Sequence, residues 1–338
     1  MNNEFDLKSK VRANIWSLSP YSSARDEFTG TEGVFLDANE NPYGSNNRYP
    51  DPHQRELKHA LAEIKSVSDK NIFIGNGSDE VIDLVYRVFC EPSKDSVIIC
   101  PPTYGMYEVS ANINNVGLIR IPLTQKFELD IDNILKQNAK AIFICSPNNP
   151  TGNYLRNIET ILEKFDGIVV VDEAYIDFSE NKSYINHITK HPNLIVMQTF
   201  SKAWGLASAR VGVAYASKDI IKLMNKTKPP YNVSKFNQDK AIEALANSKQ
   251  YQEQIKIILE QRSLLSNELE KIDCVKKVYP SDANFILIEV DDATDIYNKL
   301  VSKKIITRNR TTQIKNCIRI TVGTIEENRE LINELKRI

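Results

Sequence analysis

The chain has 338 residues, with 43 Lys plus Arg against 44 Asp plus Glu, so its formal net charge at pH 7 is −1. This length suits one large or two medium-sized domains, and the balanced charge gives no basic surface for nucleic acid or anionic membranes. The five cysteines form no C-x-x-C pair, the four histidines form no metal-ligand cluster, and residues 1–16 lack the apolar stretch typical of a signal peptide, while no run of 18 apolar residues occurs. We therefore expect a cytoplasmic protein without a metal site, in which any anionic ligand is bound by a local cluster of cations.

Short apolar runs alternate with helical patterns from about residue 70 onward. The segment 79–89 is one such pattern, since its apolar residues recur every three or four positions. Strands that are apolar on both faces belong in a sheet covered by helices on both sides, which predicts an α/β fold with a mainly parallel sheet. The predicted strands are residues 71–74, 96–100, 141–145, 167–171 and 194–197.

The pattern changes after about residue 250. A charged amphipathic stretch at 251–272 leads into short strands, and a last helix is predicted to begin at Thr324, where the sequence Thr-Ile-Glu-Glu can form a capping box. This part looks like a smaller α+β domain. We expect a large domain over residues 34–248 and a small domain formed by residues 1–33 and 249–338.

Small and polar residues follow the predicted strands, at the edge where open α/β sheets bind their ligands. The segment Gly75-Asn-Gly-Ser78 lies between a strand and a helix, so Gly77 and Ser78 can form a phosphate cradle from backbone N–H groups and a hydroxyl. A helix N-cap at Ser78 is the simpler alternative. A dinucleotide-binding motif fits poorly, because Glu80 replaces its third glycine.

Two charged residues follow neighbouring apolar runs. Asp172 ends one of them, where a carboxylate is costly unless it meets a cation or a hydrogen-bond donor. Lys202 taken alone is a solvated lysine, and Asp172 taken alone is a capping or ion-paired residue. Together with the polar and aromatic residues at the other strand ends, they suit a phosphorylated pyridine aldehyde. The lysine would form a Schiff base, the carboxylate would keep the ring nitrogen protonated, and an aromatic side chain would stack on the ring.

Three motifs carry a resemblance to known enzymes. SPNNPTG at 146–152, VVDEAY at 170–175 and T-F-S-K-A-x-G-L-A-x-x-R-x-G at 199–212 resemble the signatures of fold-type-I pyridoxal-phosphate aminotransferases. Within that family, the histidinol-phosphate aminotransferases are similar from near residue 12 to the C-terminus. Trp204 and Ser208-Ala209 depart from the usual residues and leave the packing behind Lys202 open. The segments that carry the closer similarity are 20–25, 36–42, 48–50, 100–107 and 319–324.

The resemblance implies a reaction, a cofactor and a set of residues. The reaction would be transamination of histidinol phosphate with 2-oxoglutarate to imidazole-acetol phosphate and glutamate, in L-histidine biosynthesis. The cofactor would be pyridoxal 5′-phosphate, and the enzyme would be a homodimer without nucleic-acid or membrane partners. The catalytic residues would be Lys202, Asp172 and Tyr175. These three would also bind the cofactor, together with Gly77, Ser78, Asp79, Tyr104, Asn149, Thr199, Ser201, Arg210 and, reaching the neighbouring subunit's cofactor phosphate, Tyr49. The substrate would be bound by Tyr21, Asn149, Arg308 and Arg319.

Other functions stay open at this point. An aromatic amino-acid aminotransferase and a threonine-phosphate decarboxylase share the fold and differ in their amino donor. A Rossmann-type dehydrogenase would need the glycine that Glu80 replaces. A non-catalytic sheet protein would leave Lys202 and Asp172 unexplained.

Overall fold

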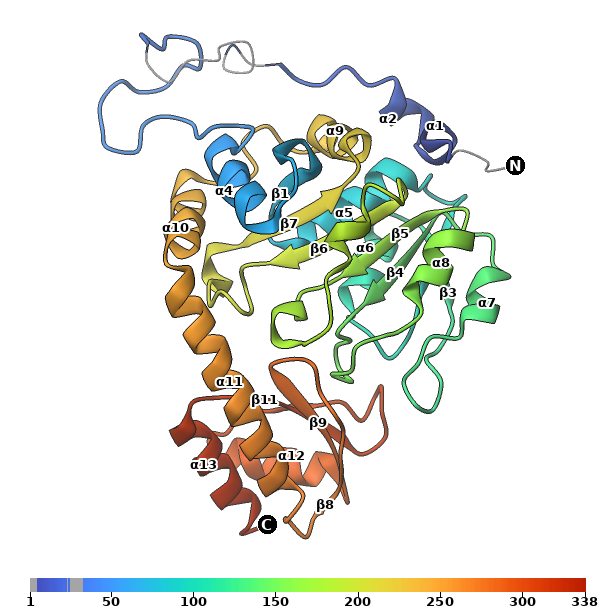
Figure 1. Cartoon of the computed structure of the whole chain (residues 1–338), viewed down its shortest axis with the longest axis vertical. Helices are drawn as coiled ribbons and strands as arrows, with labels where there is room; N and C mark the ends of the chain where they lie inside the picture. The colour runs from blue at the N-terminus through green and yellow to red at the C-terminus, as the bar shows by residue number, and fades with distance from the viewer. Residues whose placement is uncertain (1–4, 23, 25–32) are drawn as a thin grey trace.

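The computed structural model describes residues 5–22, 24 and 33–338, which form two β-sheets with their helices (Figure 1). The larger sheet consists of β1 (Ile72–Asn76), β2 (Ser96–Ile99), β3 (Gly117–Arg120), β4 (Ala141–Cys145), β5 (Ile168–Asp172), β6 (Leu194–Thr199) and β7 (Val211–Ala216). Their order across the sheet is β1-β7-β6-β5-β4-β2-β3. Strands β3, β2, β4, β5 and β6 pair in parallel, whereas β7 is antiparallel to both of its neighbours. The predicted mainly parallel sheet is confirmed, with β7 as the exception.

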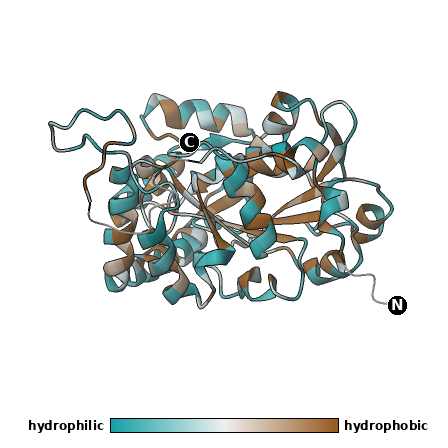
Figure 2. Cartoon of the chain, turned by 90° about the horizontal axis from the view of Figure 1, so that it is seen from above, coloured by the Kyte–Doolittle hydropathy of each residue, from teal (hydrophilic) through white to brown (hydrophobic). Residues whose placement is uncertain are grey.

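Helices cover both faces of this sheet. In Figure 2 the strands are apolar and lie between helices whose outward faces are polar. Alternate residues of each strand enter opposite clusters: Val169 and Val171 lie in one, Ile168 and Val170 in the other. One face is covered by α4 (Arg55–Lys65), α7 (Ile131–Leu135), α8 (Ile158–Lys164) and α10 (Lys235–Ala246). The other is covered by α5 (Ser78–Phe89), α6 (Met106–Ile113) and α9 (Lys218–Thr227). This double covering explains why the strands are continuously apolar.

The N-terminal helices α1 (Leu7–Lys10) and α2 (Ala13–Trp16) lie beside the large sheet, at the end of the molecule far from the C-terminus (Figure 1). Val11 and Ile15 enter the apolar cluster of α5 and α9, and Arg12 Nη1 donates to the carbonyl oxygen of Arg87 over 3.0 Å. The sequence predicts that residues 1–33 belong to the small domain. Residues 5–16 pack elsewhere, residues 1–4, 23 and 25–32 lie outside those described, and the division into two domains stays a prediction.

The smaller sheet is antiparallel, in the order β10-β11-β9-β8. Its strands are β8 (Val275–Val278), β9 (Phe285–Val290), β10 (Arg308–Asn309) and β11 (Cys317–Thr321). It packs on α12 (Ala293–Ser302), α13 (Ile325–Leu335) and the end of α11 (Ser248–Leu269), the long helix that descends from the large sheet in Figure 1. The predicted capping box is confirmed: Thr324 Oγ1 accepts the Glu327 N–H, and Glu327 Oε2 accepts the Thr324 N–H. The smaller α+β part of the predicted fold is thus confirmed.

None of the helices in the described part of the chain is long and apolar enough to cross a lipid bilayer.

Candidate active site

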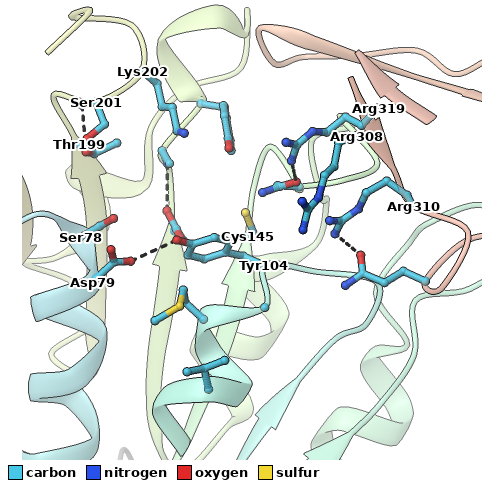
Figure 3. A pocket seen from close by; sticks show the side chains of 18 of the residues that line it. Ser78, Asp79, Tyr104, Cys145, Thr199, Ser201, Lys202, Arg308, Arg310 and Arg319 are labelled. Atoms are coloured by element: carbon cyan, nitrogen blue, oxygen red, sulfur yellow. Dashed lines mark hydrogen bonds between the residues drawn. The ribbon is translucent and has the colours of Figure 1, made fainter. Parts of the chain in front are cut away.

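A cavity of about 610 Å³ opens between the carboxyl ends of the parallel strands and the small sheet. Figure 3 shows Ser78, Asp79 and Lys202 on one side of it, and the arginines of the small sheet on the other. The cavity therefore brings together residues that are far apart in the sequence. The predicted residues that line it are Ser78, Asp79, Tyr104, Asn149, Asp172, Tyr175, Thr199, Ser201, Lys202, Arg210, Arg308 and Arg319.

The first turn of α5 forms one end of the cavity. The helix begins at Ser78 directly after Gly77, which has a φ of 75°, and no side chain among the described residues caps its first N–H groups. Arg210 extends across this turn, with Nη2 3.1 Å from Asp79 Oδ2 and Nη1 3.4 Å from Ser201 Oγ. A Cβ at position 77 would lie 2.5 Å from Nη2 at the flexible end of Arg210, so the positive φ is the main reason for glycine there. Free amides, a helix N-terminus, hydroxyls and a guanidinium together suit a phosphate group.

Asp172 lies on the floor of the cavity, at the end of β5, and is 3% exposed. Tyr107 Oη donates to Oδ2 over 2.6 Å, and the Ala174 N–H donates to Oδ1 over 3.1 Å. Burial raises the pKa of Asp172, while these two hydrogen bonds act against the rise. No cation of the described residues lies within ion-pair distance of the carboxylate. A protonated ring nitrogen would supply that missing positive partner, so the site fits a pyridine ligand.

Lys202 enters the cavity from the connection after β6. Its Nζ lies 5.6 Å from the centre of the Tyr175 ring. Burial lowers the pKa of Lys202, and the nearby positive charge of Arg319 lowers it further. Trp204 fills the space behind this lysine, and its ring stacks on Tyr251 of α11 with centroids 3.7 Å apart. A lysine with a lowered pKa has a larger neutral, nucleophilic fraction near pH 7.

The small sheet provides the opposite wall. Arg308 of β10 is the register partner of Arg319 of β11, so both side chains stand on the same part of this sheet. Arg319 Nη1 donates to Asn149 Oδ1, and its guanidinium lies 5.2 Å from the centre of the Phe285 ring. Burial lowers the pKa of Arg319, and Arg308 adds to the effect. The wall that faces Lys202 is thus cationic and suits the anionic end of a substrate.

Two predicted residues lie away from the cavity of this chain. Tyr49 is 50% exposed and stacks on Tyr231, with ring centroids 4.4 Å apart. Tyr21 is 72% exposed, in the N-terminal segment. Arg25, which ends the motif that begins at residue 20, lies outside the described residues. The roles of Tyr21 and Tyr49 therefore remain predictions.

The cavity also contains residues to which the sequence reasoning gave no role. Met106 and Cys145 line it, and the Tyr107 hydroxyl donates to the Asp172 carboxylate. Arg310 and Gln313 line it beside Arg308. A signal for Arg310 was present: residues two apart in an extended backbone share a face, so Arg308 facing the cavity predicts the same for Arg310, which follows β10 directly and continues its pairing with Cys317.

Comparison with known proteins gives a family from the sequence and the same fold from the structure. The family model "Aminotransferase class I and II" matches residues 31–335. The histidinol-phosphate aminotransferase of Cytophaga hutchinsonii is 54% identical, over 98% of this chain and 99% of its own length. The crystal structure of the histidinol-phosphate aminotransferase from Clostridium acetobutylicum has a TM-score of 0.80 at 23% identity and covers 86% of this chain and 90% of that chain. A second structure, the enzyme from Sinorhizobium meliloti in complex with pyridoxal-5′-phosphate, has a TM-score of 0.78 at 24% identity and covers 86% and 82%. The expected fold is confirmed.

Proposed function

Because the chain belongs to the family of class I and II aminotransferases, we propose that it exchanges the amino group of histidinol phosphate with 2-oxoglutarate, forming imidazole-acetol phosphate and glutamate in L-histidine biosynthesis. The observation that carries this proposal is the polarity of the cavity. An amine and a buried carboxylate stand on one side, at Lys202 and Asp172, and arginines of the small sheet stand on the other. A substrate with an amino group and a phosphate at its two ends matches that arrangement.

The donor set on the large sheet fits pyridoxal 5′-phosphate. When bound, this cofactor supplies an aldehyde that accepts the amino group and a ring that takes up the electrons released at the substrate Cα. Asp172 would hold the proton on its ring nitrogen and Lys202 would bond to its aldehyde. The phosphate would be held by the hydroxyls of Ser78, Thr199 and Ser201, the guanidinium of Arg210 and the N–H groups that follow Gly77, among them that of Asp79, and the ring by Tyr104, Asn149 and Tyr175.

Lys202 would serve as the base that removes the proton from the substrate Cα and as the acid that delivers it to the C4′ carbon of the cofactor. A base must be unprotonated, and the burial and cationic neighbours of Lys202 lower its pKa in that direction. Tyr175, whose ring lies under the lysine, limits the directions in which the amine can move. The same amine can therefore take the proton at the substrate Cα and deliver it at the cofactor C4′ without a second base.

The anionic groups of the substrates are bound by Arg308 and Arg319. Arg319 receives the phosphate side of histidinol phosphate in one half-reaction and a carboxylate of glutamate in the other, since a planar guanidinium donates in pairs to both. Asn149 accepts from Arg319 and so fixes the direction of the fork. We propose that Tyr21 also binds the anionic group of the substrate, together with Arg308 and Arg319.

The enzyme acts as a homodimer in this proposal. The segment before α4 exposes large apolar side chains: Val34 is 90%, Leu36 88% and Tyr43 84% exposed. Monomeric proteins seldom expose such residues close together, and covering them with a second copy is favourable. Tyr49 lies at the end of this segment and would reach the partner's cofactor phosphate. The free state of all five cysteines supports the cytoplasm as the compartment.

An amino-donor screen on the purified holoenzyme tests the function. We expect the kcat/KM of histidinol phosphate to exceed that of histidinol by roughly a thousandfold, because two charge-assisted contacts of about 1.5 to 3 kcal/mol each are lost with the phosphate. Equal values for the two donors would contradict the proposal. A preference for phenylalanine would favour the aromatic aminotransferase, and carbon dioxide release from threonine phosphate would favour the decarboxylase.

A further inference from the structure

The cationic wall of the cavity contains three arginines, one more than the substrate roles above use. Arg308, Arg310 and Arg319 all line the cavity, and Figure 3 shows their side chains grouped together opposite Lys202. The first two are separated by one residue, and the third pairs with Arg308 across the sheet. Three positive charges at one wall repel one another, so the arrangement favours a ligand that brings negative charge.

No carboxylate of the described residues neutralises this wall. The carboxylates that line the cavity are Asp79 and Asp172, on the large sheet. Asp79 is engaged by Arg210 and Tyr104, and Asp172 by Tyr107 and the Ala174 backbone. None of the three arginines of the small sheet forms an ion pair among the described residues.

Arg310 has unused hydrogen-bonding capacity. Its Nη2 donates to Gln313 Oε1, while its Nε is buried and has no hydrogen-bond partner within the part of the chain described. Burial lowers the pKa of Arg310 to about 10, and Arg319 and Arg308 contribute to the decrease. A buried donor without a partner is costly, and an anionic ligand would remove that cost.

The backbone holds Arg310 at a fixed place. Its N–H donates to the carbonyl oxygen of Cys317 over 2.8 Å, which continues the pairing of the small sheet by one residue. Its carbonyl oxygen accepts the N–H groups of Gln313 and Ile314, each over 2.8 Å. Gln313 is neutral, so it orients the guanidinium without cancelling its charge. These contacts make Arg310 a pre-positioned cation and not a flexible surface residue.

We propose that Arg310 is a specificity-determining residue that contacts the phosphate of the substrate and selects doubly charged phosphate esters over singly charged carboxylates. This inference rests on the proposed function, since it concerns the same cavity. A phosphate monoester carries about −1.5 to −2 charges near pH 7, whereas a carboxylate carries one. Two arginines can be satisfied by a carboxylate that Asn149 helps to orient, but the third is satisfied only by the additional charge and oxygen atoms of a phosphate.

The test compares the two half-reactions in the Arg310→Gln holoenzyme. We expect kcat/KM for histidinol phosphate to fall by about 10- to 100-fold, and for glutamate by less than about threefold. The loss should appear in KM, because the phosphate takes no part in bond making and its contact stabilises the ground state and transition state alike. A purely structural role of Arg310 would lower kcat for both donors.

Two further variants separate charge from position. Gln313→Glu leaves Arg310 in place but pairs its charge, so it should reproduce the selective loss with histidinol phosphate. Lys315→Gln is the matched control, because it removes one positive charge from an exposed residue near the same turn that does not line the cavity. We expect this control to keep both values of kcat/KM within about twofold of wild type.

The outcomes distinguish this inference from the proposed function. If the wild-type enzyme does not prefer histidinol phosphate to histidinol, the proposed function fails. If the wild type has that preference and both Arg310→Gln and Gln313→Glu keep it, the function stands and Arg310 has no part in selecting phosphate. Equal losses with histidinol phosphate and glutamate would also overturn the inference.

Discussion

Replacement of Tyr107 by phenylalanine tests how Asp172 is kept in its buried position. Tyr107 is fully buried, Asp172 is 3% exposed, and their side-chain oxygen atoms are 2.6 Å apart. The substitution removes the hydroxyl and leaves Oδ2 of the carboxylate without its donor. A hydrogen bond to a charged group contributes about 1.5 to 3 kcal/mol to stability, and a buried group that loses its partner costs a similar amount. We expect the free energy of unfolding at pH 8 to fall by about this amount.

The effect should depend on pH with a defined sign. The pKa of Asp172 is raised in the folded protein by burial, and the Tyr107 hydrogen bond acts against that rise. An acid with a raised folded pKa destabilises the fold as pH increases from its unfolded pKa through its folded pKa. Removal of the hydroxyl raises the folded pKa further and extends this window upward. The loss in Tyr107→Phe should therefore be larger at pH 8 than at pH 5.

Urea denaturation of the apoprotein at the two pH values measures this difference. The matched control is Tyr86→Phe, which removes a hydroxyl from an equally buried tyrosine whose acceptor is the uncharged carbonyl oxygen of Tyr107, 2.7 Å away. This control should lose only about 0.5 to 1.5 kcal/mol, with the same value at both pH values. Equal and pH-independent losses in the two variants would refute the view that Tyr107 supports a charged Asp172.

Three other predictions concern the proposed chemistry and assembly. The purified holoprotein should be yellow, and borohydride should fix the cofactor to the peptide of Lys202; mass-spectrometric labelling of any other lysine would show that the lysine is misassigned. The Asp172→Asn variant should keep much of the cofactor, as measured by absorbance, but its kcat should fall by orders of magnitude, because a neutral amide does not stabilise a proton on the ring nitrogen. A near-normal rate would show that Asp172 has no part in the mechanism. Mixing Tyr49→Phe chains with Lys202→Ala chains should restore activity above either parent, since some hybrid dimers contain one intact site; a monomeric protein in solution would exclude shared sites.

The residues at the strand ends could be predicted from the sequence because burial on both faces leaves a clear apolar signal. The run that ends at Asp172 is an example: each residue from Ile168 to Val171 is buried, and the first polar side chain marks the edge of the sheet. The capping box at Thr324 was equally visible, since it depends on residues three positions apart. Local rules sufficed in both cases.

Features that depend on distant contacts were missed. β7 was not predicted, because its sequence Val-Gly-Val-Ala-Tyr-Ala contains small residues with weak strand preference. Gly212 is small for a tertiary reason: a Cβ there would lie 2.3 Å from the backbone of Gly77 and Ser78. Tyr107 appeared as one aromatic residue of a motif, and only the packing of α6 against α5, β2 and β3 brings it to Asp172. The N-terminal segment packs on α5 and α9 through Val11 and Ile15, and two apolar residues are too few to indicate a partner from sequence.

The division of the cavity between two sheets has a consequence for how its substrate range can change. The side chains proposed to hold the cofactor stand on the large sheet, whereas the cationic wall comes from β10, β11 and the turn between them. This hairpin is short and continuous in the sequence, so an exchange of residues 308–319 would alter the accepted amino donor and leave Lys202, Asp172 and the α5 turn untouched. After gene duplication, substitutions in this one hairpin are enough to change the preferred amino donor, and the same segment can be exchanged as a unit in protein design.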